Sequence, residues 1–359
     1  MKNFLHLKSI AMLLALSLIC SCFLFGCTSV TGNGGTQNNN SADASQNDTA
    51  ASSFDKYSKI SKTGFFFSTV VSVTLYGTSD ETILEDCFLC MNDYEKMLSK
   101  TVEGSDIWNI NHSEGTAVEV SEETAVLLRM ADSFSKLSEG AFDLTVAPVV
   151  SLWDFTGEEP HTVPSETDIK EALSHVDYQN LTVDGTTVTL LDSAAEVDPG
   201  AIAKGFIADR IKSWLLERGV TCGLISLGGN VLTFGSKPDG SPWNIAIRKP
   251  FGESSESITT VSFKDGKSIV TSGTYERYFE QDGVIYHHIL NPDTGYPVSN
   301  GLTSVTILSN SSAEGDALST ACFVLGLEKG MELIESRDGI EALFITEDLN
   351  MHKSSGFPG

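Results

Sequence analysis

The sequence predicts an α+β fold, and two observations favour this class. Short segments rich in β-branched and aromatic residues follow one another in hairpin-like runs between residues 223 and 308, and helical periods are grouped around them. A parallel α/β sheet would instead show strands and helices in regular alternation. Hydrophobic residues make up 41% of the 359, so the chain can bury a sizeable core and is not fully disordered.

The first half of the globular part predicts one strand, two helices and a hairpin. Residues 65–76 are dominated by β-branched and aromatic side chains and predict the strand. Amphipathic periods at 80–98 and 121–137 predict the helices, the second with Ser121 as its N-cap. Residues 181–190 alternate in polarity about an Asp-Gly pair, which is typical of a hairpin.

The second half predicts a helix at 201–217, followed by strands and two late helices. The predicted strands are 223–227, 243–248, 258–263, 275–280, 286–290 and 303–308. The late helices are expected near 315–325 and 328–335.

The N-terminus has the pattern of an export signal. Lys2 and Lys8 precede an almost continuous apolar run at 10–25, which is too short for a comfortable membrane span. The run ends at a glycine followed by Cys27, like a bacterial lipobox, so residues 1–26 are expected to be a lipoprotein signal peptide and Cys27 to be lipidated. An ordinary signal peptide and an uncleaved anchor are the alternatives.

Composition divides the remainder into a tether and a domain. Residues 27–55 are rich in Ser, Asn, Thr, Gly, Gln and Ala and predict a flexible tether, whereas 56–359 predict one globular domain. The formal net charge of −25 argues against a sequence-independent nucleic-acid binder. It does not exclude an anionic ligand, because a lysine, a helix N-terminus or a divalent metal ion can hold phosphate on an acidic protein.

Four cysteines lie outside the signal region: Cys87, Cys90, Cys222 and Cys322. The Cys-x-x-Cys pair falls on an apolar helix face, which favours small buried side chains. No second such pair completes a zinc site, and a domain of this size does not depend on a disulfide framework.

Residues 197–205 (VDPGAIAKG) combine an acid, a Pro-Gly turn and a lysine at a helix start. Free backbone N–H groups and Lys204 would suit a phosphate. Alternatively, Asp198 caps the helix, Pro199 takes its first position and Lys204 is solvated. The residues alone leave both interpretations open.

Three later segments carry further candidates. Residues 225–230 (ISLGGN) place a glycine pair after a strand, which admits a ligand or only turns the chain. Residues 271–273 (TSG) lead to 286–295 (YHHILNPDTG), which also reads as strand and turn. On a strand, His287 and His288 point to opposite faces, so at most one readily serves a given site as a base or has instead a structural role.

Asp316 and Thr320 are spaced i and i+4 on a predicted helix and therefore share a face. Both are hard oxygen ligands, which suit Mg²⁺. The alternative is an N-cap aspartate and a threonine bonded back to its own helix.

Six stretches together resemble the ApbE family, the FAD:protein FMN transferases. They are GAFDLTVAPVVSLWDF (from Gly140), VDPGAIAKGFIADRI (from Val197), ISLGGNV (from Ile225), TSGTYERYF (from Thr271), YHHILNPDTGYPV (from Tyr286) and DALSTACFVLG (from Asp316). They follow the family's order and cover the chain from about residue 56 to the end. The resemblance implies an ApbE-like, T-fold-related α+β domain with mixed, largely antiparallel sheets, packed helices and two lobes.

The resemblance also implies an activity. FAD would be split at its pyrophosphate in a Mg²⁺-dependent reaction, FMN would be joined through a phosphoester to a threonine hydroxyl of an acceptor flavoprotein, and AMP would leave. The enzyme would sit at the extracytoplasmic face of the bacterial cell membrane, lipid-anchored through Cys27. The acceptor would be a membrane electron-transfer subunit with an exposed FMN-binding segment, and no nucleic acid is implied as a partner.

Site residues follow from the resemblance motif by motif. The implied Mg²⁺ ligands are Asp316, Thr320 and the backbone carbonyl of Ala201. The implied FAD contacts are Ala141, Phe142, Asp143, Asp198, Lys204, Ser272, Gly273 and His288. His288 is the implied base and Lys204 the implied catalytic cation, with His287 as the weaker candidate for the base.

The sequence departs from the family pattern near the flavin pocket rather than at the metal and phosphate motifs. Residues 67–69 (FST) stand where Met-Gly-Thr is frequent, and Asn291 stands where an Asp is usual. Residues 98–101 lack an aromatic residue that the family often has at the end of this stretch.

Three functions remain as alternatives to the transferase. They are an FAD pyrophosphatase in which water replaces the threonine, a non-catalytic flavin-binding lipoprotein, and a purely structural lipoprotein.

Overall fold

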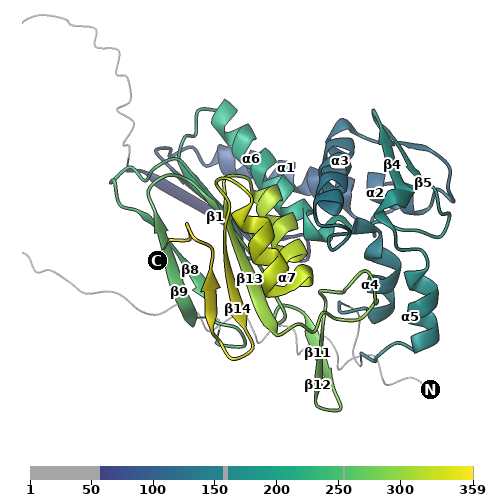
Figure 1. Ribbon diagram of the computed structural model, residues 1–359. Coiled ribbons are helices and arrows are strands. Elements are labelled where there is room, and N and C mark those ends of the chain that lie inside the picture. Colours follow the sequence, from purple (N-terminus) through teal and green to yellow (C-terminus); the bar gives the residue numbers. More distant parts are fainter. Residues whose placement is uncertain (1–56, 157–160, 254, 359) are drawn as a thin grey trace, which may run out of the picture. The chain divides into compact units, whose positions relative to one another are not determined.

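An eight-stranded antiparallel sheet forms the centre of the structure, a computed structural model that describes residues 57–156, 161–253 and 255–358 (Figure 1). The strand order is β1-β2-β6-β7-β10-β13-β14-β15. The strands are β1 (Lys59–Phe66), β2 (Thr69–Tyr76), β6 (Gly223–Leu227), β7 (Asn230–Phe234), β10 (Ser268–Gly273), β13 (Leu302–Ser309), β14 (Glu341–Thr346) and β15 (Met351–Lys353). All described residues belong to one compact unit, Ser52–Gly359.

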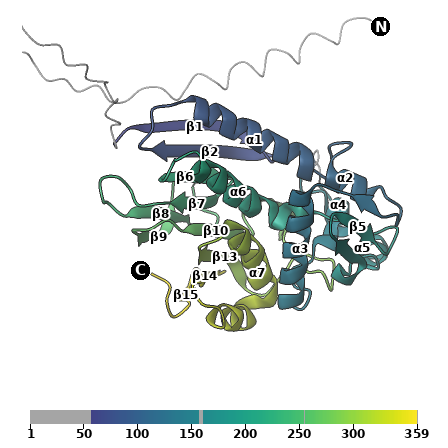
Figure 2. The ribbon, with the colours of Figure 1, turned by 90° about the horizontal axis from the view of Figure 1, so that it is seen from above.

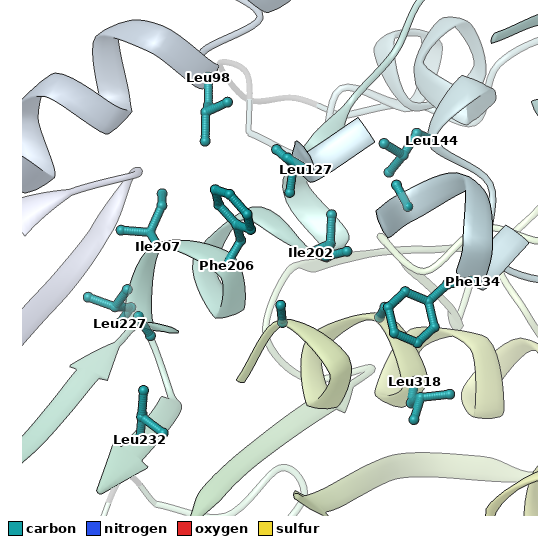
Figure 3. Packing of buried hydrophobic residues seen from close by; sticks show 14 of the residues in the cluster. Leu98, Leu127, Phe134, Leu144, Ile202, Phe206, Ile207, Leu227, Leu232 and Leu318 are labelled. Atoms are coloured by element: carbon teal, nitrogen blue, oxygen red, sulfur yellow. The ribbon is translucent and has the colours of Figure 1, made fainter. Parts of the chain in front are cut away.

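Three helices cover one face of this sheet and form the main core with it. They are α1 (Thr82–Leu98), α6 (Ala203–Glu217) and α7 (Ser312–Glu335). Figure 3 shows Phe206 near the middle of this core, with Ile207 and Leu127 on either side. Burial of these apolar side chains is the main stabilising term for the domain.

The opposite face of the sheet is covered by a hairpin of β8 (Trp243–Arg248) and β9 (Ser257–Phe263). Figure 2 shows this hairpin and the helices α6 and α7 on opposite sides of the strands. Ile247 and Val261 of the hairpin share a second apolar cluster with Ile269 of β10. Strands β10 and β13 are therefore buried on both faces, so side chains on β10 hold fixed positions.

A second group of elements lies beside the helices (Figure 1). It contains α2 (Asp106–Asn111), β3 (Val118–Glu119), α3 (Glu122–Leu137), η1 (Leu144–Val146), α4 (Ala147–Trp153), α5 (Glu166–Leu173), η2 (Tyr178–Asn180), β4 (Leu181–Asp184) and β5 (Thr187–Leu190). The remaining elements are the turn η3 (Pro199–Ala201) and a separate hairpin of β11 (Tyr278–Gln281) and β12 (Val284–His287). Helix α3 contacts α7, which joins this group to the sheet.

The predicted α+β class is confirmed, and most predicted elements lie where the patterns put them. Ser121 caps α3 by accepting a hydrogen bond from Thr124 N, as predicted. The 181–190 hairpin is present as β4 and β5. The late helices form one element, α7, with a break at Gly326, where φ is +83°.

Two strand predictions are wrong, and a third, 275–280, is strand only from Tyr278 onward, as β11. Residues 65–76 form not one strand but parts of β1 and β2, joined by a turn at Phe67 and Ser68, whose φ values are +53° and +57°. Such a two-residue turn usually carries Asn or Gly. Phe67 and Ser68 are neither, so the sequence pattern did not indicate a turn here. The strand predicted at 286–290 ends at His287, which leaves His288 outside β12.

The export signal (residues 1–26), Cys27 and the whole of the 27–55 tether fall outside the described residues. Within the described residues, no helix is long and apolar enough to cross a membrane. Cys87, Cys90, Cys222 and Cys322 are free thiols. Burial raises the pKa of the Cys87 thiol to about 12, which suits a packing role.

Candidate active site

Helices α6 and α7 cross at a point where no side chain separates their backbones. A Cβ on Gly205 would lie 2.1 Å from the Ser312 carbonyl oxygen, so only glycine fits. One turn later, the Asp209 carboxylate accepts hydrogen bonds from Ser312 N (3.0 Å), Ala313 N (3.0 Å) and Ser311 Oγ (2.7 Å). Asp209 thus caps α7 from α6 and fixes how the two helices meet. No local sequence pattern indicated this role.

Asp316 lies at this crossing, with 4% of its surface exposed. Its Oδ2 accepts a hydrogen bond from Gly205 N at 2.9 Å. In a regular helix Gly205 N would donate to the Ala201 carbonyl, four residues earlier. Because Gly205 N donates to Asp316 instead, the Ala201 carbonyl lacks this helical partner and remains available to a ligand.

Ser272 on β10 joins a third segment to the crossing. Its Oγ lies 2.7 Å from Ser319 Oγ and 3.2 Å from Thr320 Oγ1, both on α7. Ser319 Oγ also contacts the Asp316 carbonyl oxygen at 2.9 Å. The structure therefore brings together predicted site residues from three separate motifs. Ser319 was not predicted, and only its place between Asp316 and Thr320 could have indicated it.

The donors at this place fit a hard divalent cation. They are the Asp316 carboxylate, the Thr320 hydroxyl and the Ala201 carbonyl, all oxygen atoms. No group of three His, Cys, Asp or Glu side chains that could hold a metal is found among the described residues. A cation here would therefore take few protein ligands and complete its shell with water or phosphate, as Mg²⁺ does.

Asp198 and Lys204 lie on the turn that precedes α6. Asp198 Oδ1 accepts from Gly200 N at 2.9 Å and so caps η3, while its Oδ2 pairs with Lys100 Nζ at 2.7 Å. Capping by Asp198 with Pro199 at the first position is the structural interpretation of this segment. Lys204 Nζ donates to the Gly200 carbonyl at 3.0 Å, which keeps its ammonium at the same turn.

The two adjacent histidines have different surroundings. His287 is 5% exposed, its Nε2 contacts the Val298 carbonyl at 2.9 Å, and its Nδ1 accepts from Ile289 N at 3.3 Å. His288 is half-buried, and its Nδ1 contacts the Arg277 carbonyl at 3.2 Å. A carbonyl only accepts hydrogen bonds, so Nδ1 of His288 is the protonated nitrogen and Nε2 is left as an acceptor.

His288 is neutral at pH 7. Burial lowers its pKa to about 3, and the positive charges of Arg277 and, less strongly, Lys204 act in the same direction. Lys204 is thus close enough to His288 to influence it, which links the α6 turn to the segment after β12. An uncharged imidazole with a free Nε2 can accept a hydrogen bond from a hydroxyl group, and it can take up the proton where nearby negative charge raises its pKa.

Comparison with known proteins decides the family. The model described as the ApbE family matches residues 67–344. The chain belongs to the ApbE family. A FAD:protein FMN transferase of Klebsiella pneumoniae is 40% identical over 279 residues, which are 77% of this chain and 86% of that protein. One from Treponema pallidum is 37% identical over 289 residues, 76% of this chain and 79% of that protein.

Solved ApbE structures share the fold. The crystal structure of the ApbE protein from Thermotoga maritima superposes with a TM-score of 0.77 at 35% identity, over 83% of this chain and 97% of that one. The flavin transferase ApbE from Vibrio cholerae gives a TM-score of 0.75 at 29% identity, over 84% of this chain and 98% of that one. The ApbE-like fold predicted from the motifs is confirmed.

In this ApbE-family chain, an aromatic cluster holds the segment that carries His288. Trp153 Nε1 donates to the Gly295 carbonyl at 2.9 Å. The rings packed around Trp153 are Phe155, Phe279, Tyr286 and Tyr296. The cluster joins α4 to the β11–β12 hairpin and to the loop after His288, and thereby fixes where His288 lies. We refer to Trp153 and these four rings as the Trp153 cluster.

The segment predicted to line the FAD pocket is largely engaged within the protein. Phe142 is 1% exposed and packs edge-on against Phe134, and Ala141 is half-buried. Asp143 Oδ1 accepts from Thr145 N at 2.7 Å, and burial raises the pKa of its carboxyl group. The segment reaches the α6 turn through the backbone bond from Asp198 N to the Leu144 carbonyl at 2.9 Å.

Two further predicted positions have backbone roles. Gly273 ends β10, and a Cβ there would lie 2.7 Å from the Tyr275 ring, so glycine lets that ring pack. Asn291, the departure from the family's usual Asp, accepts from Asp293 N at 2.7 Å through Oδ1. An amide oxygen makes this turn bond as a carboxylate would, so the departure preserves the loop.

Proposed function

We propose that this chain transfers FMN from FAD to a threonine hydroxyl of an acceptor flavoprotein, through a phosphoester bond, in a Mg²⁺-dependent reaction that releases AMP. Family membership and the relatives support FMN transfer from FAD to a protein. The observation that supports the finer proposal is the convergence of Asp316, Thr320 and Ser272 at the start of α6. A non-catalytic flavin binder would not need this set of oxygen donors.

The bond changes are those of a phosphoryl transfer. The threonine oxygen attacks the phosphorus of the FMN phosphate, the bond from that phosphorus to the bridging oxygen breaks, and AMP leaves with the bridging oxygen. The hydroxyl proton passes to Nε2 of His288, whose Nδ1–H is held by the Arg277 carbonyl. Lys204 supplies positive charge beside the same turn. Asp198, paired with Lys100, positions that turn.

Mg²⁺ would be held by Asp316, Thr320 and the Ala201 carbonyl. Bound there, the ion supplies positive charge that offsets the charge on the diphosphate oxygens. Asp316 is already oriented for this role by Gly205 N, and Thr320 by its contact with Ser272. The remaining FAD contacts proposed from the motifs are Ala141, Phe142, Asp143, Ser272 and Gly273.

Export and anchoring belong to the same proposal. Cys27 would carry the lipid, residues 1–26 would be removed, and the tether would hold the domain at the extracytoplasmic face of the membrane, where an exposed acceptor segment can be reached. Fractionation tests this: Cys27→Ala should move the protein from the membrane to the soluble extracytoplasmic fraction. A soluble wild-type protein would contradict the anchor.

The activity is tested by intact mass of an acceptor domain with FAD and Mg²⁺, alongside AMP release. We expect the acceptor to gain one FMN phosphoryl unit, and Asp316→Ala to abolish the gain. Glu328→Ala, which removes an exposed carboxylate from the same helix, is the matched control and should retain activity. Release of AMP and FMN without acceptor modification would favour the pyrophosphatase. FAD that binds but stays unchanged would favour the flavin-binding lipoprotein.

A further inference from the structure

Arg277 touches the candidate base but has no role in the motif-based site. It lies between β10 and β11, and its side chain is exposed. Its carbonyl oxygen accepts both His288 N, at 3.1 Å, and His288 Nδ1, at 3.2 Å. The two residues are therefore held against each other across the start of the β11–β12 hairpin.

The guanidinium group of Arg277 is not neutralised by a neighbour. Its sequence neighbour Glu276 pairs with Arg248 at 3.5 Å, and within the described residues no carboxylate forms an ion pair with Arg277. Its charge reaches the His288 ring, as does that of Lys204. Arg277 and Lys204 are thus both close enough to act on the charge of a neutral imidazole, in a chain with 48 acidic and 23 basic residues.

An exposed arginine that has no ion-pair partner is available to an anionic ligand. Most other basic side chains near the α6 turn are engaged: Lys100 pairs with Asp198, and Arg210 pairs with Glu123. A diphosphate brings two negative charges, and an arginine can bind phosphoryl oxygens through two parallel N–H groups. An arginine on the His288 side of the diphosphate would also bind phosphoryl oxygens on which negative charge develops as the leaving group departs.

We propose that Arg277 is a second phosphate-binding residue, which binds the diphosphate of FAD from the His288 side while Lys204 binds it from the α6 side. This inference rests on the proposed function, because it takes FAD as the substrate. It makes Arg277 a catalytic residue through direct contact with phosphoryl oxygens, and it assigns to the residue's backbone carbonyl the separate task of orienting His288.

The test is calorimetric binding of ADP, with adenosine as the uncharged probe, to the mature chain in the presence of Mg²⁺. We expect Arg277→Ala to weaken ADP binding about tenfold or more, the usual size of a lost hydrogen bond to a charged group. Arg277→Lys should restore part of that loss, because it keeps the charge but not the two parallel donors. Adenosine binding should be unchanged in both variants.

Arg218→Ala is the matched control, since Arg218 is an exposed arginine that stacks on Trp214 at the far end of α6. It should bind ADP as the wild type does. Thermal unfolding of Arg277→Ala should match the wild type, because its side chain is exposed. Equal ADP affinity in Arg277→Ala and wild type would overturn the inference, and so would a loss of ADP binding that accompanies a lowered Tm and is not partly restored by lysine.

Failure of this inference is distinguishable from failure of the proposed function. If the wild type flavinylates the acceptor and Arg277→Ala does so with an unchanged KM for FAD, only the role of Arg277 is wrong. If the wild type binds FAD but modifies no acceptor, the transferase proposal fails, whatever ADP binding shows. We expect Arg277→Ala to raise the KM for FAD about tenfold, with a further fall in kcat.

Discussion

The crossing of α6 and α7 and the Trp153 cluster both position the candidate site, by different means. At the crossing, polar groups bind one another: Asp209 caps α7, and Asp316 accepts from Gly205. In the cluster, rings pack around Trp153 and hold the hairpin and loop on either side of His288. The crossing thus builds the candidate site from residues that we propose to perform its chemistry, whereas the cluster stabilises a loop. Substitutions in the two regions should therefore affect different properties.

The largest effect is expected from Trp153→Ala. Removing a fully buried Trp leaves a cavity and costs about 3–5 kcal/mol of unfolding free energy. Urea unfolding measures this cost. Mg²⁺ affinity should persist in the fraction that remains folded, since the crossing is intact. Loss of Mg²⁺ binding in the folded variant would show that the two regions are not independent. Leu152→Ala, at a partly exposed neighbouring position, is the control and should cost far less.

Gly205→Ala should be nearly as severe, although it adds only one methyl group. The new Cβ would overlap the Ser312 carbonyl, and backbone cannot move aside as a flexible side chain can. We expect a loss of about 3 kcal/mol, at the upper end for overpacking, together with loss of Mg²⁺ affinity. Glu217→Ala, exposed on the same helix, should stay within about 0.5 kcal/mol of wild type. A stable, active Gly205→Ala would disprove the tight crossing.

Asp316→Asn separates chemistry from stability at the crossing. Asparagine can still accept from Gly205 N through its amide oxygen, so the unfolding free energy should change little. The negative charge toward Mg²⁺ is lost, and we expect the transfer rate to fall about 100-fold with weaker dependence on Mg²⁺. Metal titration with single-turnover kinetics measures both. An unchanged rate would remove Asp316 from the proposed metal site.

The smallest effect concerns pH. His287 and His288 both have a folded-state pKa below the unfolded value of about 6.5, His288 at about 3. As the pH falls below 6.5, the unfolded chain binds protons that the folded chain does not, so stability is lost toward acid. Each group contributes at most about 1.4 kcal/mol per pH unit. Unfolding at pH 7 and pH 5 should show a smaller difference in His288→Asn than in wild type.

Both histidines are expected to make stability depend on pH in the same direction, so unfolding alone does not separate their roles. Transfer activity therefore has to be measured as well. His288→Asn should slow transfer more than it weakens FAD binding, because the base is lost. His287→Asn should chiefly lower stability, since both ring nitrogens of His287 have partners inside the protein. If His287→Asn slowed transfer more than His288→Asn did and left the unfolding free energy unchanged, the assignment of His288 as the base would be wrong.

Local patterns predicted the elements whose signals are complete within a few residues. The helices α1 and α3 and the strands β6 and β8 have periodic side chains and clear ends, and the structure has them as predicted. The turn at Phe67 and Ser68 lacked the residues that usually mark one, and it was missed. Strands β7, β10 and β14 were not predicted as strands, because buried segments take their structure from neighbours in the sheet. The short, exposed edge strand β15 was also missed.

By itself, the sequence determined the helix face shared by Asp316 and Thr320, because residues four apart on a helix are always neighbours. It also determined, through its ordered motifs, the family to which the chain belongs. Only the tertiary structure decided that Gly205 donates to Asp316 and that Ser272 reaches Thr320, across separations of 111 and 48 residues. Such contacts depend on how distant elements pack, and no local spacing encodes that packing.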